Sequence, residues 1–152
     1  MKEIHGITML RIEGLKRIGI DSMFFIYLLE DHPDFSDIVS SILKDVESGE
    51  MTGVTSVITL LEILVKPKMD YNVSAVDDYK NVLSNFPNLE IVPVDNKIAD
   101  IASTLRADYG IKTPDAIQVA TSIKEGCSAF LTNDFALKKI KEIRVITLRD
   151  II

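Results

Sequence analysis

Short apolar runs alternate with longer stretches in which apolar residues recur at helical spacing along most of this chain. The short runs predict strands at residues 16–20, 54–56, 89–94, 129–131 and 145–148. The longer stretches predict helices at residues 22–30, 33–48, 57–65, 72–86, 97–109, 114–125 and 135–140. Because strands that alternate with helices are typical of α/β domains, we predict a three-layer α/β/α fold with a mainly parallel central sheet.

Polar residues and prolines mark several helix and strand ends. Ser56, Asp95 and Thr113 each precede a predicted helix and are expected to cap it. Pro67 is expected shortly after the end of the helix that begins at residue 57. Pro93 favours either the last residue of its strand or a strand at the sheet edge, because proline cannot donate a backbone hydrogen bond.

Two segments differ from this regular pattern. Residues 22–30 are apolar nearly all round, which predicts a buried helix; an exposed part of it would favour a dimer or partner groove. Residues 4–12 are ambiguous, with an additional edge strand as one interpretation. In open parallel sheets the functional site lies at the carboxyl ends of the strands, so the residues that follow the strands are the candidate site residues.

Four acidic residues occupy positions at or near these strand ends. Asp21 and Asp134 follow predicted strands, and Asp115 lies in the first turn of a helix. Each aspartate, taken alone, could simply cap or stabilise a helix N-terminus. Glu62 lies in the middle of an apolar helix, where burying a lone carboxylate is costly, although it could also point outward.

Together these acids predict a metal site. Several carboxylates within a few ångströms cannot all stay ionised without a cation. Mg²⁺ and Mn²⁺ prefer oxygen ligands, and neither His5 nor His32 has metal-ligand spacing with the other or with Cys127. We therefore expect Mg²⁺ or Mn²⁺ at these four acids.

Length and charge further limit the possible functions. The 152 residues suffice for one domain, and 17 basic against 23 acidic residues give a net charge of −6. That charge argues against bulk electrostatic capture of nucleic acid, although bound cations would cancel part of it. Basic residues gather near the C-terminus, either as a solvated helix face or as a phosphate-contacting patch. They are Lys138, Lys139, Lys141, Arg144 and Arg149.

Other features exclude or weaken several classes. The single cysteine, Cys127, forbids an internal disulfide, and we expect an inert buried thiol. We find no signal peptide or membrane span, so a soluble cytoplasmic protein without membrane association is expected. The sequence has no glycine-rich phosphate loop and no Ser-His-Asp arrangement, which disfavours nucleotide triphosphatases and serine hydrolases.

The motifs around the four acids occur in a recognisable order. They are residues 20–22 (Ile-Asp-Ser), 55–62 (Thr-Ser-Val-Ile-Thr-Leu-Leu-Glu), 109–120 (Tyr-Gly-Ile-Lys-Thr-Pro-Asp-Ala-Ile-Gln-Val-Ala) and 131–135 (Leu-Thr-Asn-Asp-Phe). In this order the sequence resembles the PIN-domain family and, within it, the VapC-type toxins of toxin–antitoxin pairs. The resemblance covers residues 17–152 as a PIN-like nuclease domain, and residues 1–16 form an N-terminal extension of unknown role.

The resemblance implies roles for particular residues. Asp21, Glu62 and Asp115 would be the main metal ligands, and Asp134 would complete the acidic pocket. Ser22 and Thr132 would orient the carboxylates through hydrogen bonds. From their charge, Arg106, Lys138 and Lys139 are candidate RNA contacts, with plain surface positions as the alternative.

The resemblance also implies a reaction and partners. The expected activity is metal-dependent hydrolysis of RNA phosphodiester bonds, leaving 5′-phosphate and 3′-hydroxyl ends. A toxin of this type implies an antitoxin partner and a homodimer. Two alternatives remain: an RNA-processing nuclease without an antitoxin, and a non-catalytic PIN module used for assembly or RNA binding.

Overall fold

The computed structural model describes residue 12 and residues 14–151, and its centre is a parallel five-stranded sheet. The strand order is β3-β2-β1-β4-β5, and every neighbouring pair is parallel. The strands are β1 (Arg17–Ile20), β2 (Thr52–Ser56), β3 (Leu89–Val92), β4 (Ala129–Thr132) and β5 (Arg144–Thr147). This arrangement confirms the predicted α/β class and parallel sheet.

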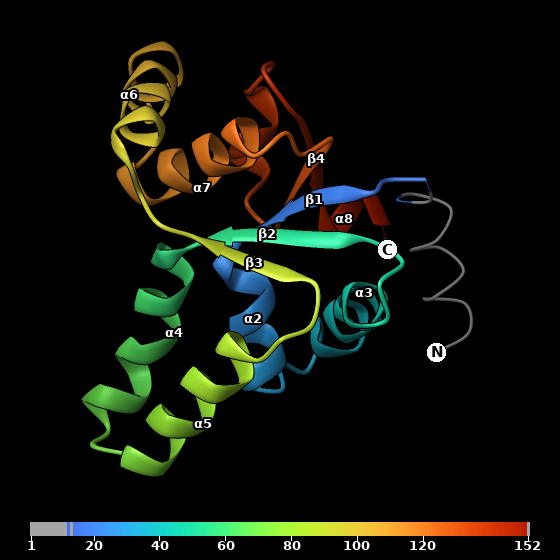
Figure 1. The fold of residues 1–152 in the computed structure, drawn as a ribbon, viewed down its shortest axis with the longest axis vertical. Helices are drawn as coiled ribbons and strands as arrows, with labels where there is room; N and C mark the ends of the chain where they lie inside the picture. Colours follow the sequence, from blue (N-terminus) through green and yellow to red (C-terminus); the bar gives the residue numbers. More distant parts are fainter. Residues whose placement is uncertain (1–11, 13, 152) are drawn as a thin grey trace.

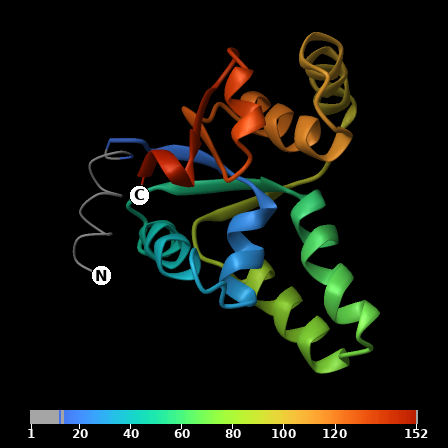
Figure 2. The ribbon, with the colours of Figure 1, turned by 180° about the vertical axis from the view of Figure 1, so that it is seen from behind.

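Helices cover both faces of the sheet and complete the three layers (Figures 1 and 2). The lower layer in Figure 1 holds α2 (Ser22–Leu29), α3 (Ser36–Glu47), α4 (Val57–Met69) and α5 (Val73–Ser84). The upper layer holds α6 (Asn96–Tyr109) and α7 (Thr113–Lys124). The 3₁₀ helix η1 (Phe135–Lys139) precedes β5, and α8 (Leu148–Ile151) follows it. Each layer encloses its own buried apolar cluster, one around Phe24 and one around Phe130.

The central strand β1 brings helix α7 close to the sheet. Gly19 pairs with Val54 on β2 and Phe130 on β4. A Cβ atom at Gly19 would lie only 1.8 Å from Ser122 Oγ on α7, so a larger residue would push the helix away. The glycine therefore lets α7 pack directly against β1, one residue before its carboxyl end.

Several predicted ends are confirmed. Ser56 caps α4 by accepting a hydrogen bond from Ile58 N, and Asp95 caps α6 through Ile98 N. Strand β3, which Pro93 follows, lies at the sheet edge. In the described part of the chain no helix is long and apolar enough to cross a membrane.

Other predicted ends were wrong. Helix α3 begins at Ser36, not at residue 33, and α4 continues to Met69 with Pro67 inside it. Pro67 is buried, and this packing offsets the backbone hydrogen bond that the proline cannot donate. Lys112 occupies the N-cap of α7 without a side-chain hydrogen bond, so Thr113 is the first helical residue and not the cap.

Two further interpretations concern packing and the N-terminus. Phe24 and Phe25 of α2 are buried, as the apolar pattern predicted. Cys127 is partly buried, and burial raises the pKa of its thiol to about 12, which agrees with an inert group. The possible strand at residues 4–12 lies outside the described residues except for Ile12, which is helical and buried.

Candidate functional site

Asp21 is the buried centre of the candidate site. It follows β1 directly, caps α2 and is 5% exposed. One carboxylate oxygen, Oδ1, accepts a hydrogen bond from Ser22 N at 2.8 Å. The other, Oδ2, accepts one from Thr132 Oγ1 at 2.7 Å. Asp21 is thus both a helix cap and an acid held rigidly from two strand ends.

Glu62 reaches the same place from α4. Its Oε1 accepts a hydrogen bond of 2.9 Å from Ser22 Oγ, which also lies 3.4 Å from Asp21 Oδ1. A serine hydroxyl has one proton, so it donates to one of these carboxylates at a time. The side chain of Glu62 is half-buried and does not point away from the sheet edge as the outward interpretation required.

Asp115 and Asp134 approach from the other side. Asp115 lies in the first turn of α7 and is half-buried. Asp134 is exposed, and its N–H donates to Thr132 Oγ1 at 3.1 Å. Its Oδ1 caps η1 by accepting from Ala136 N at 2.9 Å. Thr132 therefore contacts both Asp21 and Asp134.

The acids affect one another electrostatically. Burial, and then the negative charge of Glu62, raise the pKa of Asp21, against the effect of the hydrogen bonds from Thr132 and Ser22. The pKa of Asp115 is raised to about 6 by burial first and then by the charges of Asp21 and Asp134. Lys112, the residue before α7, opposes this shift. The four acids therefore form one region of excess negative charge.

This donor set suits a hard divalent cation in chemistry, although not yet in spacing. Carboxylate oxygens without nitrogen or sulfur partners favour Mg²⁺ or Mn²⁺. Excess negative charge in a half-buried place is also relieved by a cation. Among residue 12 and residues 14–151, however, no three acidic, histidine or cysteine side chains stand close enough to form a ready coordination sphere. Metal binding would thus require these side chains to move toward one another.

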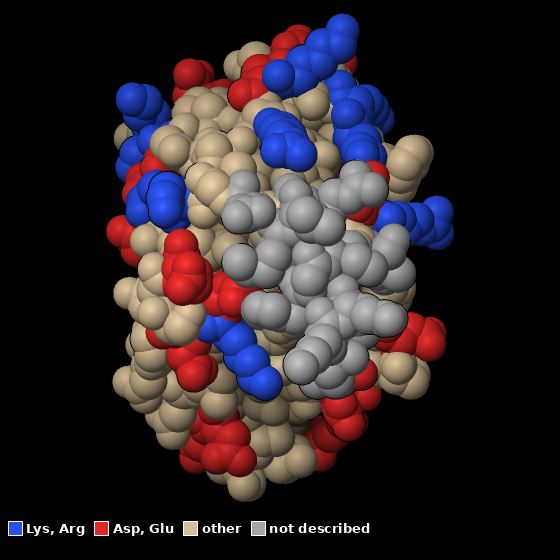
Figure 3. Space-filling model, turned by 90° about the vertical axis from the view of Figure 1, so that its right-hand side faces the viewer, with Lys and Arg blue, Asp and Glu red and all other residues tan. Residues whose placement is uncertain are grey.

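The three candidate RNA contacts are all exposed side chains. Arg106 is exposed, and its Nε donates to the carbonyl of Ile111 at 3.0 Å, four residues before Asp115. Lys138 and Lys139 belong to η1, directly after Asp134, and both are exposed. Lys138 pairs with Asp150 at 2.6 Å. Figure 3 shows a different side of the molecule, the one at the amino ends of the strands in Figure 1; there basic side chains gather mostly in the upper half and acidic ones in the lower half.

The motifs contain two further polar residues, one buried and one half-buried, that sequence reasoning did not single out. Gln118 on α7 hydrogen-bonds to Ser56 and Thr59 at the start of α4. Asn133 Nδ2 donates to Tyr27 Oη at 2.8 Å. An amide between Ile117 and Val119 in an apolar helix was the available signal for Gln118, while its partners could not be read from the sequence.

Comparison with known proteins adds a family and a set of similar folds. Residues 18–143 match the sequence model of the PIN domain. VapBC2 from Rickettsia felis, solved with a DNA fragment from their promoter, contains a similar chain with a TM-score of 0.70 and 18% identity. The match covers 86% of this chain and 98% of that one.

Two further solved structures are similar. A toxin–antitoxin complex from Klebsiella pneumoniae gives a TM-score of 0.65 and 22% identity, covering 87% of this chain and 97% of that one. VapC20 from Mycobacterium tuberculosis, a toxin that cleaves the sarcin-ricin loop, gives 0.65 and 15%, covering 84% and 98%. No curated protein matches this chain in sequence. At these identities the structures establish a shared fold.

Proposed function

This chain belongs to the PIN domain family, and we propose that it is a metal-dependent endoribonuclease acting as the toxin of a toxin–antitoxin pair. The observation that carries the proposal is the link from Asp21 through Ser22 to Glu62, with Asp115 and Asp134 close enough to shift the shared electrostatics. The four acids come from four separate segments of the chain, and a fold needs no such concentration of negative charge for stability.

In this proposal Asp21, Glu62 and Asp115 would hold Mg²⁺ or Mn²⁺, and Asp134 would complete the acidic pocket. When bound, such an ion lowers the pKa of a water ligand and stabilises charge on phosphoryl oxygens. Thr132 holds one oxygen of Asp21 through its hydroxyl, and Ser22 sits between Asp21 and Glu62. Both hydroxyls would orient carboxylate lone pairs toward the site.

Basic side chains around the acids would hold the RNA backbone. Arg106 on α6 contacts the loop that leads into α7, Lys112 ends this loop, and Lys138 and Lys139 lie in η1, which follows Asp134. Contacts of this kind position a phosphodiester without reading its sequence. Such local contacts would allow a protein of net charge −6 to bind RNA.

An antitoxin partner and a homodimer belong to the same proposal. The similar chain from Klebsiella pneumoniae comes from a toxin–antitoxin complex. On α4 the side chains of Leu61, Val65 and Met69 recur every four residues and are 59%, 48% and 73% exposed. This stripe adjoins a cavity of about 440 Å³ that Glu62 helps to line. A partner segment covering the stripe would remove apolar surface from water beside the acids.

The direct test is incubation of the protein with total cellular RNA, with and without a chelator, followed by mapping of the 5′ ends. We expect discrete 5′-phosphate ends that disappear with chelator. Asp115→Asn should lower the cleavage rate on the order of a thousandfold, because a bound metal supplies several kcal/mol of transition-state stabilisation. Asp95→Asn, which also changes one carboxylate at a helix N-terminus, is the matched control and should cleave normally.

A non-catalytic PIN module is the second candidate. The observation in its favour is that no three of the described acids form a ready metal site. Such a module would give no chelator-sensitive ends, and the Asp115→Asn and wild-type proteins would behave alike on RNA. Normal cleavage by Asp115→Asn would contradict the proposed mechanism.

A further inference from the structure

A buried hydrogen-bond cluster joins the two helices that carry Asp115 and Glu62. Helix α7 lies above the sheet and α4 below it, and they meet beyond the carboxyl end of β2 (Figure 1). At this junction Gln118 from α7 contacts Ser56 and Thr59 from the start of α4. All three side chains are at most 2% exposed.

The amide of Gln118 is held at both ends. Its Oε1 accepts from Ser56 Oγ at 2.9 Å and from Ser56 N at 3.3 Å. Its Nε2 donates to Thr59 Oγ1 at 2.9 Å, and that oxygen lies 2.6 Å from Thr55 Oγ1. Because the backbone N–H of Ser56 can only donate, the reversed amide would place two donors against each other. The orientation of Gln118 is therefore fixed.

The cluster stands one helical turn from each acid. Asp115 precedes Gln118 by three residues on α7, and Glu62 follows Thr59 by three residues on α4. Residues three apart project from the same side of a helix. A fixed link between residues 118 and 59 consequently constrains where both carboxylates can stand relative to each other.

We infer that Gln118 is a positioning residue, which sets the separation of Asp115 and Glu62 by tying α7 to the start of α4. This inference rests on the proposed function, since it gives the link a purpose in holding a shared cation. An apolar side chain of the same length would fill the space equally well. The amide adds a directional contact that crosses from one helix layer to the other.

Two other hydrogen-bonding side chains at α4 and α7 do not provide the same constraint. Ser22 holds Glu62 toward Asp21, and within the described part of the chain it forms no hydrogen bond with α7. Thr121, one turn further along α7, is also buried, but its Oγ1 donates to Ile117 O within its own helix at 2.7 Å. Thr121 therefore offers a matched control: a buried hydroxyl on α7 that does not reach α4.

The test compares Gln118→Met with Thr121→Val in the full chain. Methionine keeps the length of the side chain and loses its donor and acceptor. Mn²⁺ affinity is measured by electron paramagnetic resonance, and RNA cleavage gives kcat and KM. We expect Gln118→Met to weaken Mn²⁺ binding and lower kcat by about 10- to 100-fold, the effect of losing support around a metal ligand, with KM for RNA changed by less than about threefold. Thr121→Val should match the wild type in both.

A metal-free measurement separates this inference from the proposed function. Hydrogen exchange at the amide of Ser56, which donates to Gln118, should be faster in Gln118→Met and unchanged in Thr121→Val. Unchanged exchange would overturn the link, and wild-type Mn²⁺ affinity in Gln118→Met would overturn its positioning role. If Gln118→Met does not fold, Thr59→Val is measured by the same criteria; it removes the oxygen that Nε2 contacts, together with the contact of that oxygen with Thr55 Oγ1. A wild-type protein that binds no Mn²⁺ would overturn the proposed function, while the exchange result would still decide the link.

Discussion

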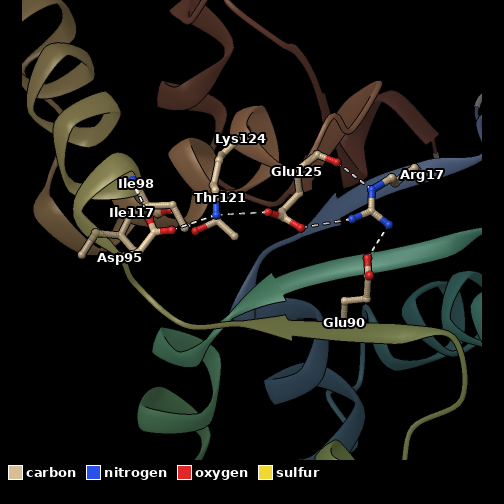
Figure 4. Close-up of polar contacts among 8 residues, drawn as sticks. All are labelled: Arg17, Glu90, Asp95, Ile98, Ile117, Thr121, Lys124 and Glu125. Atoms are coloured by element: carbon tan, nitrogen blue, oxygen red, sulfur yellow. Dashed lines mark hydrogen bonds and ion pairs between the residues drawn. The ribbon is translucent and has the colours of Figure 1, made fainter.

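Two groups of charged side chains lie on this small fold, and they differ in how their charges are compensated. On the upper face of the sheet, acidic and basic side chains alternate in a series of ion pairs (Figure 4). In order it runs through Glu90, Arg17, Glu125, Lys124 and Asp95. At the carboxyl ends of the strands, by contrast, Asp21, Glu62, Asp115 and Asp134 share one sign.

The pKa values follow this difference. A hydrogen bond from Lys124 at 2.8 Å holds the pKa of Asp95 below its usual value, so the series of ion pairs favours the ionised form of this acid. Burial and neighbouring acids raise the pKa of Asp21 and bring that of Asp115 to about 6. The series of ion pairs therefore stabilises the fold, whereas the four acids at the strand ends disfavour one another's ionised forms. An arrangement that costs stability is typical of a functional site.

The largest effect that sharpens this contrast is expected from Thr132→Val. The change keeps the shape of the residue and removes the hydroxyl that donates to Asp21 Oδ2. We expect Mn²⁺ affinity and the cleavage rate to fall about 10- to 100-fold. Thr147→Val is a matched control, because Thr147 is the register partner of Thr132 on β5 and is also buried. Equal activity of the two variants would contradict a role for the Thr132 hydroxyl.

A smaller effect, on stability alone, is expected from Arg17→Met. Arg17 Nε donates to the carbonyl of Glu125 at 2.7 Å, and its guanidinium pairs with Glu90 and Glu125. Losing these contacts should lower the free energy of unfolding by about 1–3 kcal/mol in urea titrations. RNA cleavage should be unchanged, since these contacts lie away from the acids.

Arg144 provides the control for that change. Like Arg17 it begins a strand, but it is exposed. Arg144→Met should alter the free energy of unfolding by less than about 0.5 kcal/mol. A loss of cleavage in Arg17→Met without a loss of stability would show that the two charge groups are not separate in function.

The smallest expected effect is on how the melting temperature of the metal-free protein changes with pH. An acid whose pKa is raised by folding stabilises the fold while it is protonated and loses that contribution as pH rises through the folded pKa. For Asp115 this contribution to stability is fully present below pH 3.8 and is lost by the time the pH passes about 6. Asp115→Asn lacks this titration, so its melting temperature relative to the wild type should rise between pH 4 and about 7. A difference that stays constant over this range would contradict the raised pKa.

Much of the fold could be predicted because its signals are local. The alternation of apolar runs gave the parallel sheet, and the side-chain chemistry of Ser56 and Asp95 gave two helix caps. The extension of α4 across Pro67 could not be predicted, because burial of that proline depends on the tertiary structure. The preference of threonine for N-cap positions likewise predicted Thr113 as the cap of α7, but the N-cap is Lys112, whose side chain makes no capping hydrogen bond.

The candidate site was predictable in its members more than in its geometry. Acids after strand ends are visible in a sequence, so Asp21 and Asp134 could be selected without coordinates. Apolar neighbours predicted greater burial of Glu62 than the half-buried position that the structure gives it. The partners of Gln118 depend on how two helices meet across a sheet edge, which no local pattern records.

Titration of the metal-free protein with Mn²⁺ by calorimetry tests most directly whether the acids share a cation. We expect saturable binding by the wild type and by Asp95→Asn, and a loss of affinity on the order of a hundredfold or more in Asp21→Asn and in Asp115→Asn. A wild-type protein that binds no Mn²⁺, or an Asp21→Asn protein that binds it as tightly as the wild type, would contradict the account.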